Sequence, residues 1–166
     1  MLQPLCRRTW APRGKTPIQR AWERHDRFSA IAAITVSPRR KRLGLFFQVR
    51  PHNIRAPDMV GFLRELHRQV RRPIIVVWDR YSVHRSAAKQ LREAGCRWLQ
   101  VEWLPGYAPD LNPVEAVWSH TKYSDLANYV PDDADELYDA VGNSLNDLDS
   151  NQTLLRSFFA WAELKL

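Results

Sequence analysis

Hydrophobic and polar residues follow one another along the chain in blocks that predict strands and helices in a definite order. Residues 27–36, RFSAIAAITV, and 43–49, LGLFFQV, are apolar and rich in β-formers, and the polar SPRRKR between them suits a hairpin. Residues 56–70, APDMVGFLRELHRQV, space their large apolar side chains at helical intervals, with Pro57 and Asp58 as a start signal. The pattern predicts two paired strands and then an amphipathic helix.

The second half of the pattern begins with the β-branched run Ile74 to Val77, which predicts a central strand buried on both faces. SVHRSAAKQLREAG predicts a helix that ends at Gly95, and CRWLQVEWL predicts another strand, so the two strands should be parallel. PDDADELYDAVGNSL and TLLRSFFAWAEL predict two further helices. We therefore expect an α/β fold with a mixed sheet, first a hairpin and then a parallel pair, flanked by helices.

The composition is that of a folded globular domain. The chain has 166 residues, 45% hydrophobic and 26% charged, and we expect a single domain over 1–166. It has no apolar run of about 18 residues and no signal-peptide pattern, so we expect a cytoplasmic location without a membrane contact. Cys6 and Cys96 lack partners at metal-ligand spacing and are predicted to be free thiols.

Charge is divided unequally along the chain. Residues 1–100 hold 22 of the 25 Lys and Arg and 6 of the 18 Asp and Glu, a net charge of +16, whereas residues 101–166 hold 3 and 12, a net charge of −9. Arginine dominates among the cations, and its planar fork suits phosphate. The first part therefore predicts a surface that faces a polyanion such as nucleic acid, the alternative being a solvated basic face.

Asp79 closes the predicted central strand. Ligands gather outside the carboxyl ends of strands in open parallel sheets, so an aspartate here is a candidate site residue. An ordinary alternative is that Asp79 caps the next helix or shapes the turn DRYS.

The stretch WLPGYAPDLNPVEAVWSHTK combines a stiff loop with a helix start. Pro105, Pro109 and Pro113 exclude a helix before Pro113, and Glu115 falls on the first turn after it. Asn112 and Glu115 are spaced like a capping box, which would make Glu115 a structural residue. A stiff loop also suits a carboxylate that must be held against a group on another element, and this favours a functional role.

Two carboxylates beside a strongly basic surface point to phosphodiester chemistry. Hard divalent cations prefer carboxylate oxygens, and two such ions can clamp the attacking and leaving oxygens of a phosphodiester displacement. A glycosidase-like acid and base pair is an alternative from the carboxylates alone. The basic charge favours nucleic acid as the substrate.

These motifs resemble the DDE transposases of the mariner-like superfamily and their bacterial insertion-sequence relatives. The resemblance rests on VVWDRYSVHRS and on WLPGYAPDLNPVEAVWSHTK, with 35 residues between Asp79 and Glu115, and it extends to RTWAPRGKTP near the start and to both C-terminal helices. It implies a fold similar to ribonuclease H and a site in which three carboxylates bind two Mg²⁺ or Mn²⁺ ions. Asp79 would be the second acid and Glu115 the third, each as a metal ligand. DNA ends would be cut and joined to a target.

The sequence departs from the family pattern at the first acid. That residue is expected shortly before RTWAPRG, but MLQPLCR contains no carboxylate, and Glu23 and Asp26 lie too far along to replace it. The family's N-terminal helix-turn-helix region is not recognisable either. We therefore expect a truncated catalytic domain whose first strand is partly missing and which has little strand-transfer activity alone.

Several other residues are candidates for DNA contact, each with an ordinary alternative. Arg80 and Arg85 suit phosphate but could be merely solvated. His84, five residues after Asp79, could approach DNA or the metals, the alternative being a surface or capping residue. Lys122, expected on the same face as Glu115, could instead pair with a carboxylate. Arg13 and Lys15 in a glycine-containing turn complete the set. Four tryptophans are expected in the core rather than on DNA: Trp10, Trp22, Trp98 and Trp103.

Three functions remain open at this point. The first is a transposase catalytic domain, near the nucleoid, that acts on transposon ends and target DNA once its missing strand is supplied. The second is a non-catalytic remnant that binds DNA or associates with full-length transposase or with a second copy of itself. The third is a degraded fragment that folds poorly.

Overall fold

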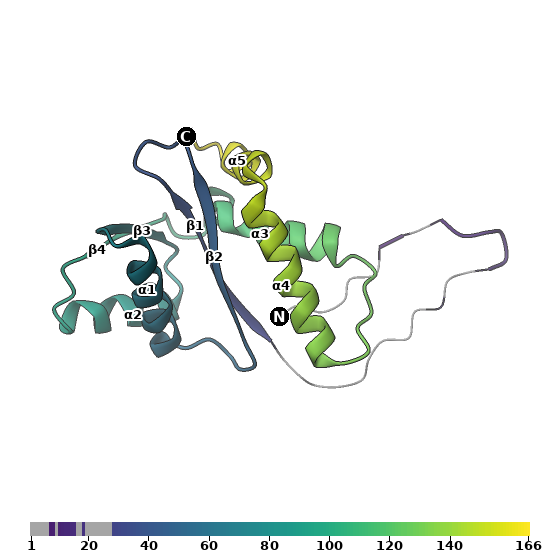
Figure 1. The fold of residues 1–166 in the computed structure, drawn as a ribbon, viewed down its shortest axis with the longest axis horizontal. Helices are drawn as coiled ribbons and strands as arrows, with labels where there is room; N and C mark the ends of the chain where they lie inside the picture. Colours follow the sequence, from purple (N-terminus) through teal and green to yellow (C-terminus); the bar gives the residue numbers. More distant parts are fainter. Residues whose placement is uncertain (1–6, 9, 16–17, 19–27) are drawn as a thin grey trace.

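The computed structural model describes residues 7–8, 10–15, 18 and 28–166 (Figure 1). The elements follow the predicted order closely. They are the strands β1 (Ser29–Val36), β2 (Leu43–Arg50), β3 (Ile74–Trp78) and β4 (Leu99–Trp103), and the helices α1 (Ala56–Val70), α2 (Ser82–Glu93), α3 (Pro113–His120), α4 (Ala134–Ser150) and α5 (Gln152–Trp161). Between β4 and α3 lies the 3-10 turn η1 (Pro109–Leu111), and the π-helical turn η2 (Thr121–Asp125) follows α3.

The strand pairs are those that the pattern predicts. β1 and β2 form an antiparallel hairpin with Ser29 opposite Arg50 and Val36 opposite Leu43. β3 and β4 are parallel, with Ile74 opposite Leu99. Gly95, in the left-handed region at φ 67°, follows α2 and turns the chain toward β4.

The two pairs form separate two-stranded sheets, so the expectation of one mixed sheet is wrong for the described residues. The expected burial of β3 on both faces is wrong as well, because Ile75 and Val77 are 64% and 57% exposed. Helices α1 and α2 cover the opposite face through Ile74 and Val76, and no described element covers Ile75. A β-branched run predicts a strand, but it does not say what covers each face.

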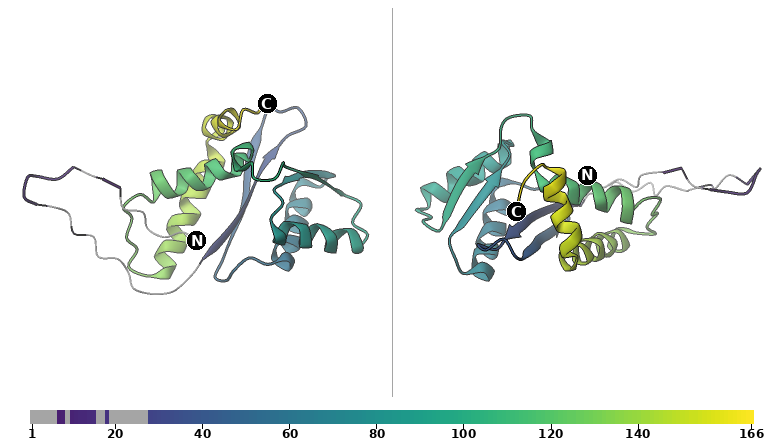
Figure 2. Two further views of the ribbon diagram at one scale, coloured as in Figure 1. Left: turned by 180° about the vertical axis from the view of Figure 1, so that it is seen from behind. Right: turned by 90° about the horizontal axis from the view of Figure 1, so that it is seen from above.

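The hairpin lies between two hydrophobic clusters and joins them. Leu43 and Leu45 of β2 pack with α3, α4 and α5, whereas Ile31 of β1 and Phe46 of β2 pack with α1, whose Phe62 is 1% exposed. Figure 2 shows α4 and α5 on one side of the hairpin and α1 and α2 on the other. Alternate residues of the strands point to opposite faces, which is why one hairpin can serve both clusters.

The outer edge of β2 is closed by side chains from the C-terminal helices. The Gln152 side-chain amide accepts from the Leu43 backbone N–H at 2.9 Å and donates to the Leu43 carbonyl at 2.8 Å. Asp149 Oδ1 accepts from the Leu45 N–H at 2.5 Å. This arrangement satisfies backbone groups that an open strand edge would expose.

Side-chain caps set the start of both C-terminal helices, three residues later than the pattern predicts for α4 and one residue earlier for α5. Asp133 is the N-cap of α4 and accepts from the Glu136 N–H at 2.8 Å, so the helix begins at Ala134. Asn151 caps α5 in the same way, accepting from the Leu154 N–H at 3.0 Å.

The tryptophans do not all lie in the core. Trp98 packs against the α1–α2 cluster, as expected. Trp103 is 37% exposed and Trp10 is fully exposed, so the expectation is wrong for Trp10 and only partly right for Trp103. Trp22 lies outside the described residues.

Candidate functional site

Asp79 follows β3 directly and organises the turn into α2. Its Oδ1 accepts a hydrogen bond from the backbone N–H of Tyr81 at 2.9 Å and lies 2.6 Å from Nδ1 of His84. The turn-shaping role considered from the sequence is therefore present. Oδ2 of Asp79 has no hydrogen-bond partner in the described part of the chain, so one carboxylate oxygen remains available for a ligand.

His84 is fixed by aromatic rings as well as by Asp79. Its imidazole stacks on Trp78, with ring centroids 4.9 Å apart and planes 10° apart, and meets the Tyr81 ring edge-on at 5.8 Å. The sequence made His84 a candidate for approaching DNA or the metals, but its pairing with Asp79 was not predicted. The spacing WDRYSVH held a signal, because a histidine in the first turn of a helix can reach back to the residue that ends the strand.

The ends of β3 and β4 are joined beside Asp79. Trp78 lies opposite Trp103 in the parallel register, and the Leu104 N–H donates to the Trp78 carbonyl at 2.7 Å. Arg80 Nε donates to the Leu104 carbonyl at 3.3 Å. The proline-rich loop that carries Glu115 therefore starts next to Asp79, and Arg80 takes part in closing this end.

The loop then delivers Glu115 to the first turn of α3. Asn112 is the N-cap, accepting from the Val114 N–H at 3.2 Å, and the Glu115 N–H donates to the Asn112 carbonyl at 3.0 Å. Tyr107, at φ 57°, takes the left-handed conformation within the loop. The Glu115 carboxylate makes no hydrogen bond or ion pair with any described residue, so the reciprocal half of a capping box is not formed. Glu115 is half-buried, and capping does not explain its carboxylate.

The two carboxylates belong to different parts of the fold. Asp79 ends a strand of the β3–β4 sheet, whereas Glu115 stands on α3, which packs on β1 and α5. Among the described residues no hydrogen bond or ion pair joins Asp79 to Glu115, and no group of three or more His, Cys, Asp or Glu side chains is arranged to hold a metal.

The other candidate residues are not all gathered near Asp79. Arg85 is exposed on α2, one residue after His84. Lys122 is half-buried in the π-helical turn η2, which follows α3. Arg13 and Lys15 are exposed at a turn in which Gly14 has φ 80°. In Figure 1 residues 10–15 lie beyond α4, on the side away from β3 and β4.

The comparisons with known proteins agree with this architecture. The family model for DDE superfamily endonucleases matches residues 2–138, and the chain belongs to that family. None of the curated proteins matches the chain significantly.

A solved structure with a similar fold is the crystal structure of the Mos1 strand transfer complex. The similarity has a TM-score of 0.62 at 16% sequence identity and covers 98% of this chain. The match shows a ribonuclease H-like fold. The chain corresponds to 48% of the Mos1 chain, about half its length. Within the part of the chain that the structure describes, no helix is long and apolar enough to cross a membrane.

Proposed function

We propose that this chain is a single catalytic domain of a transposase that cuts DNA ends and joins them to a target by divalent-metal phosphodiester chemistry. Asp79 and Glu115 would be its second and third metal-binding acids. The observation that carries this assignment concerns their carboxylate oxygens. Oδ2 of Asp79 and both oxygens of Glu115 have no hydrogen-bond or ion-pair partner among the described residues, although each residue lies at the boundary of a well-defined element.

The donor set fits a hard divalent cation. Mg²⁺ and Mn²⁺ are bound by carboxylate oxygens and water, and Asp79 and Glu115 offer such oxygens. When bound, two ions supply stabilisation of the attacking and leaving oxygens of a phosphodiester. The protein contributes the positioning, because His84 and the Tyr81 N–H fix the carboxylate plane of Asp79 and the proline loop fixes the start of α3.

The third carboxylate would come from a strand that pairs between β1 and β3. Two observations support this arrangement. The outer edge of β2 is closed by Asp149 and Gln152, yet β1 and β3 each form backbone ladders with only one described strand. Both sheets also pack on α1, so a single strand between them would produce one mixed sheet. Its end would lie between the element carrying Asp79 and the one carrying Glu115.

DNA recognition would use the basic first part of the sequence. Arg80 and Arg85 flank the candidate site, and Lys122, Arg13 and Lys15 would contact DNA further away. The partners would be transposon ends and target DNA, with a second copy or a longer transposase chain in the assembly. The similarity in fold to a strand transfer complex supports this proposal.

Metal binding by site variants tests the assignment. Titration of the chain with Mn²⁺, followed by the electron paramagnetic resonance of free Mn²⁺, should show that Asp79→Asn and Glu115→Gln each weaken binding roughly tenfold or more. Asp110→Asn is the matched control because Asp110 is an exposed carboxylate in the same loop. Equal affinities for all four proteins would show that the metal site has been assigned to the wrong residues.

A second function, DNA binding without catalysis, is favoured by one observation: the described residues offer no three-carboxylate cluster. Asp79→Ala separates the two functions. In a non-catalytic binding module this change leaves DNA affinity unchanged or slightly higher, because a repulsive charge is removed, and Mn²⁺ has no effect on plasmid nicking. In the catalytic domain, by contrast, Asp79→Ala abolishes Mn²⁺-dependent plasmid nicking. This measurement uses the chain together with the strand that would carry the third carboxylate.

A further inference from the structure

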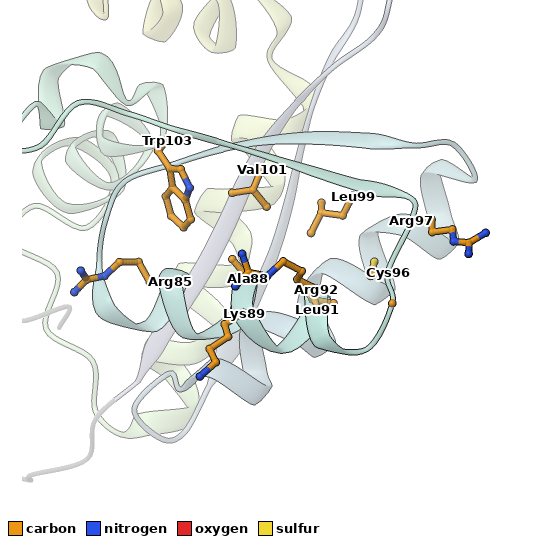
Figure 3. Close-up of a pocket in the computed structure, with 11 residues that line it drawn as sticks. Arg85, Ala88, Lys89, Leu91, Arg92, Cys96, Arg97, Leu99, Val101 and Trp103 are labelled. Carbon is orange, nitrogen blue, oxygen red and sulfur yellow. The ribbon is translucent and has the colours of Figure 1, made fainter.

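A basic groove runs along α2 and β4, away from the candidate carboxylates. It has a volume of about 530 Å³. In Figure 3 the side chains of Leu99, Val101 and Trp103 are directed from β4 toward α2, Arg85 and Arg97 lie at opposite ends, and Lys89 points away from the strand. Its cations come from α2 and from the segment between α2 and β4: Arg85, Lys89, Arg92 and Arg97. No acidic side chain is among the described residues that line the groove.

The spacing of the cations places them in one row. Arg85, Lys89 and Arg92 are separated by four and three positions, so they share a face of α2, and Arg97 extends the row beyond Gly95. All four side chains are exposed. Lys89 lies 3.8 Å from Glu93, while the other three have no ion pair with a described residue.

The helix dipole does not account for this row. A cation in the last turn, such as Arg92, stabilises a helix, but Arg85 is in the first turn, where a positive charge is unfavourable. The first turn of α2 has no acidic residue to balance it. Asp79 precedes the helix, but its Oδ1 is already bound to the Tyr81 N–H and to His84. The helix dipole therefore does not explain the position of Arg85, and an anionic ligand would complement the row of cations.

The floor of the groove is apolar and ends at an aromatic ring. Leu99 and Val101 of β4 form the floor, and Trp103 lies at the end of the strand with 37% of its surface exposed. The ring centroids of Trp103 and Trp78 are 6.3 Å apart, and Trp78 precedes Asp79. The groove therefore begins beside the candidate site and leads away from it.

We infer that this groove binds the sugar-phosphate backbone of a single nucleic-acid strand that leaves the catalytic end, with a base able to stack on Trp103. This inference rests on the proposed function, which supplies DNA as the substrate. A row of cations with an aromatic ring at one end is the arrangement that binds single strands without reading their sequence. From Arg85 to Arg92 the row of cations extends over seven helical steps, ~10 Å at about 1.5 Å per residue, which is long enough to contact several phosphates of one strand.

The first test measures the salt dependence of binding to a fluorescent 30-nucleotide single strand by anisotropy, in EDTA so that no metal chemistry contributes. The variant Arg92→Gln/Arg97→Gln removes two cations at the far end of the groove. We expect roughly tenfold weaker binding and a log–log salt slope reduced by about 1.4, since each phosphate contact on a single strand contributes about 0.7. Arg64→Gln/Arg72→Gln is the matched control, because it removes the same charge from exposed positions outside the groove.

The second test locates the strand directly. Cys96 lines the groove and is half-buried, and the Cys6→Ser variant leaves it as the sole thiol of the chain. In this variant the bound oligonucleotide should slow alkylation of Cys96 by iodoacetamide at least severalfold, and Arg92→Gln/Arg97→Gln should remove the protection. Thermal unfolding of each variant checks that the fold is retained.

Three results would overturn the inference. The first is equal affinity and salt slope for the groove variant and its control. The second is an alkylation rate of Cys96 that DNA does not change. The third is a poly-aspartate peptide that protects Cys96 more strongly than the oligonucleotide at equal charge concentration, which would assign the groove to an acidic protein segment. Because every measurement is made without metal, a Mn²⁺ affinity that Asp79→Asn leaves unchanged would defeat the proposed function and leave this test unaffected.

Discussion

Nδ1 of His84 lies 2.6 Å from Oδ1 of Asp79, and the same imidazole stacks on the Trp78 ring that precedes Asp79. The histidine therefore fixes a carboxylate oxygen from the first turn of α2. Oδ2 of Asp79 is left without a partner in the described residues. A ligand that binds Oδ2 meets a carboxylate whose rotation is already restricted.

His84→Ala should weaken Mn²⁺ binding by roughly 10- to 100-fold, the usual effect of removing a residue that positions a metal ligand. His84→Asn should recover part of the affinity, since its amide can donate to Oδ1 of Asp79. The measurement is the same Mn²⁺ titration. A purely structural role for His84 predicts instead that thermal stability falls while the Mn²⁺ affinity of the folded protein is retained.

Asn112 and Glu115 at the start of α3 are expected to contribute differently to the free energy of unfolding. Asn112→Ala should lower the free energy of unfolding by about 1 kcal/mol, because the Val114 N–H loses its acceptor. Glu115→Gln should change it by less than about 0.5 kcal/mol, because its carboxylate makes no capping bond. Urea unfolding measures both. A loss of about 1 kcal/mol in Glu115→Gln would make Glu115 a structural residue after all.

The hairpin leaves little room for a side chain at Gly44. A Cβ on Gly44 would lie 2.9 Å from Oγ1 of Thr35, the residue opposite it in the register. Threonine is restricted about χ1, so Gly44→Ala should lower the free energy of unfolding by about 1–3 kcal/mol. Thr35→Ala in the same chain removes Oγ1 and should recover part of this loss in a double-mutant cycle measured by urea unfolding. Strictly additive effects would show that the two positions do not clash.

Tyr129 and Glu136 form a surface pair with a measurable titration. The hydrogen bond from the Tyr129 hydroxyl to the Glu136 carboxylate, 2.6 Å long, is the main cause that raises the pKa of Tyr129 to about 12 and lowers the pKa of Glu136. Because the folded protein favours the neutral phenol, this contribution to stability is complete below the ordinary tyrosine pKa of about 10 and is lost as the pH rises from there to about 12. The phenolate absorbance of wild type minus Tyr129→Phe isolates this titration from the other tyrosines. Glu136→Gln should return the Tyr129 pKa toward 10, and an unchanged titration in that variant would exclude the pairing.

Asp58, in the first turn of α1, makes the stability of the protein depend on pH. The Arg55 N–H donates to its carboxylate at 2.8 Å and His52 lies 3.2 Å away, and these contacts lower the pKa of Asp58. A lowered pKa contributes stability above the unfolded-state pKa that is lost as the pH falls through the folded-state value. Urea unfolding of wild type and Asp58→Asn should therefore differ at pH 6 and converge at pH 2. A difference that persists at pH 2 would point to a contact other than the charged carboxylate.

Local pattern was enough to predict the elements of this chain. The apolar spacing of α1 and the β-branched run of β3 gave correct positions because helix and strand periods depend on neighbouring residues. The N-cap role of Asn112 followed from local chemistry for the same reason. The motifs around Asp79 and Glu115 likewise placed the chain among DDE endonucleases, which the family match confirms.

Only the tertiary structure decided how these elements meet. The exposure of Ile75, the division into two sheets and the contact of His84 with Asp79 depend on which surfaces lie opposite one another. The groove beside α2 likewise forms only because β4 lies along the helix, and the local sequence of neither element predicts this contact. The periodicity of a segment shows which of its own faces is apolar, whereas strand pairing and burial depend on two segments that are distant in sequence. The sequence therefore predicted the helices and strands, and the tertiary structure decided which of them are in contact.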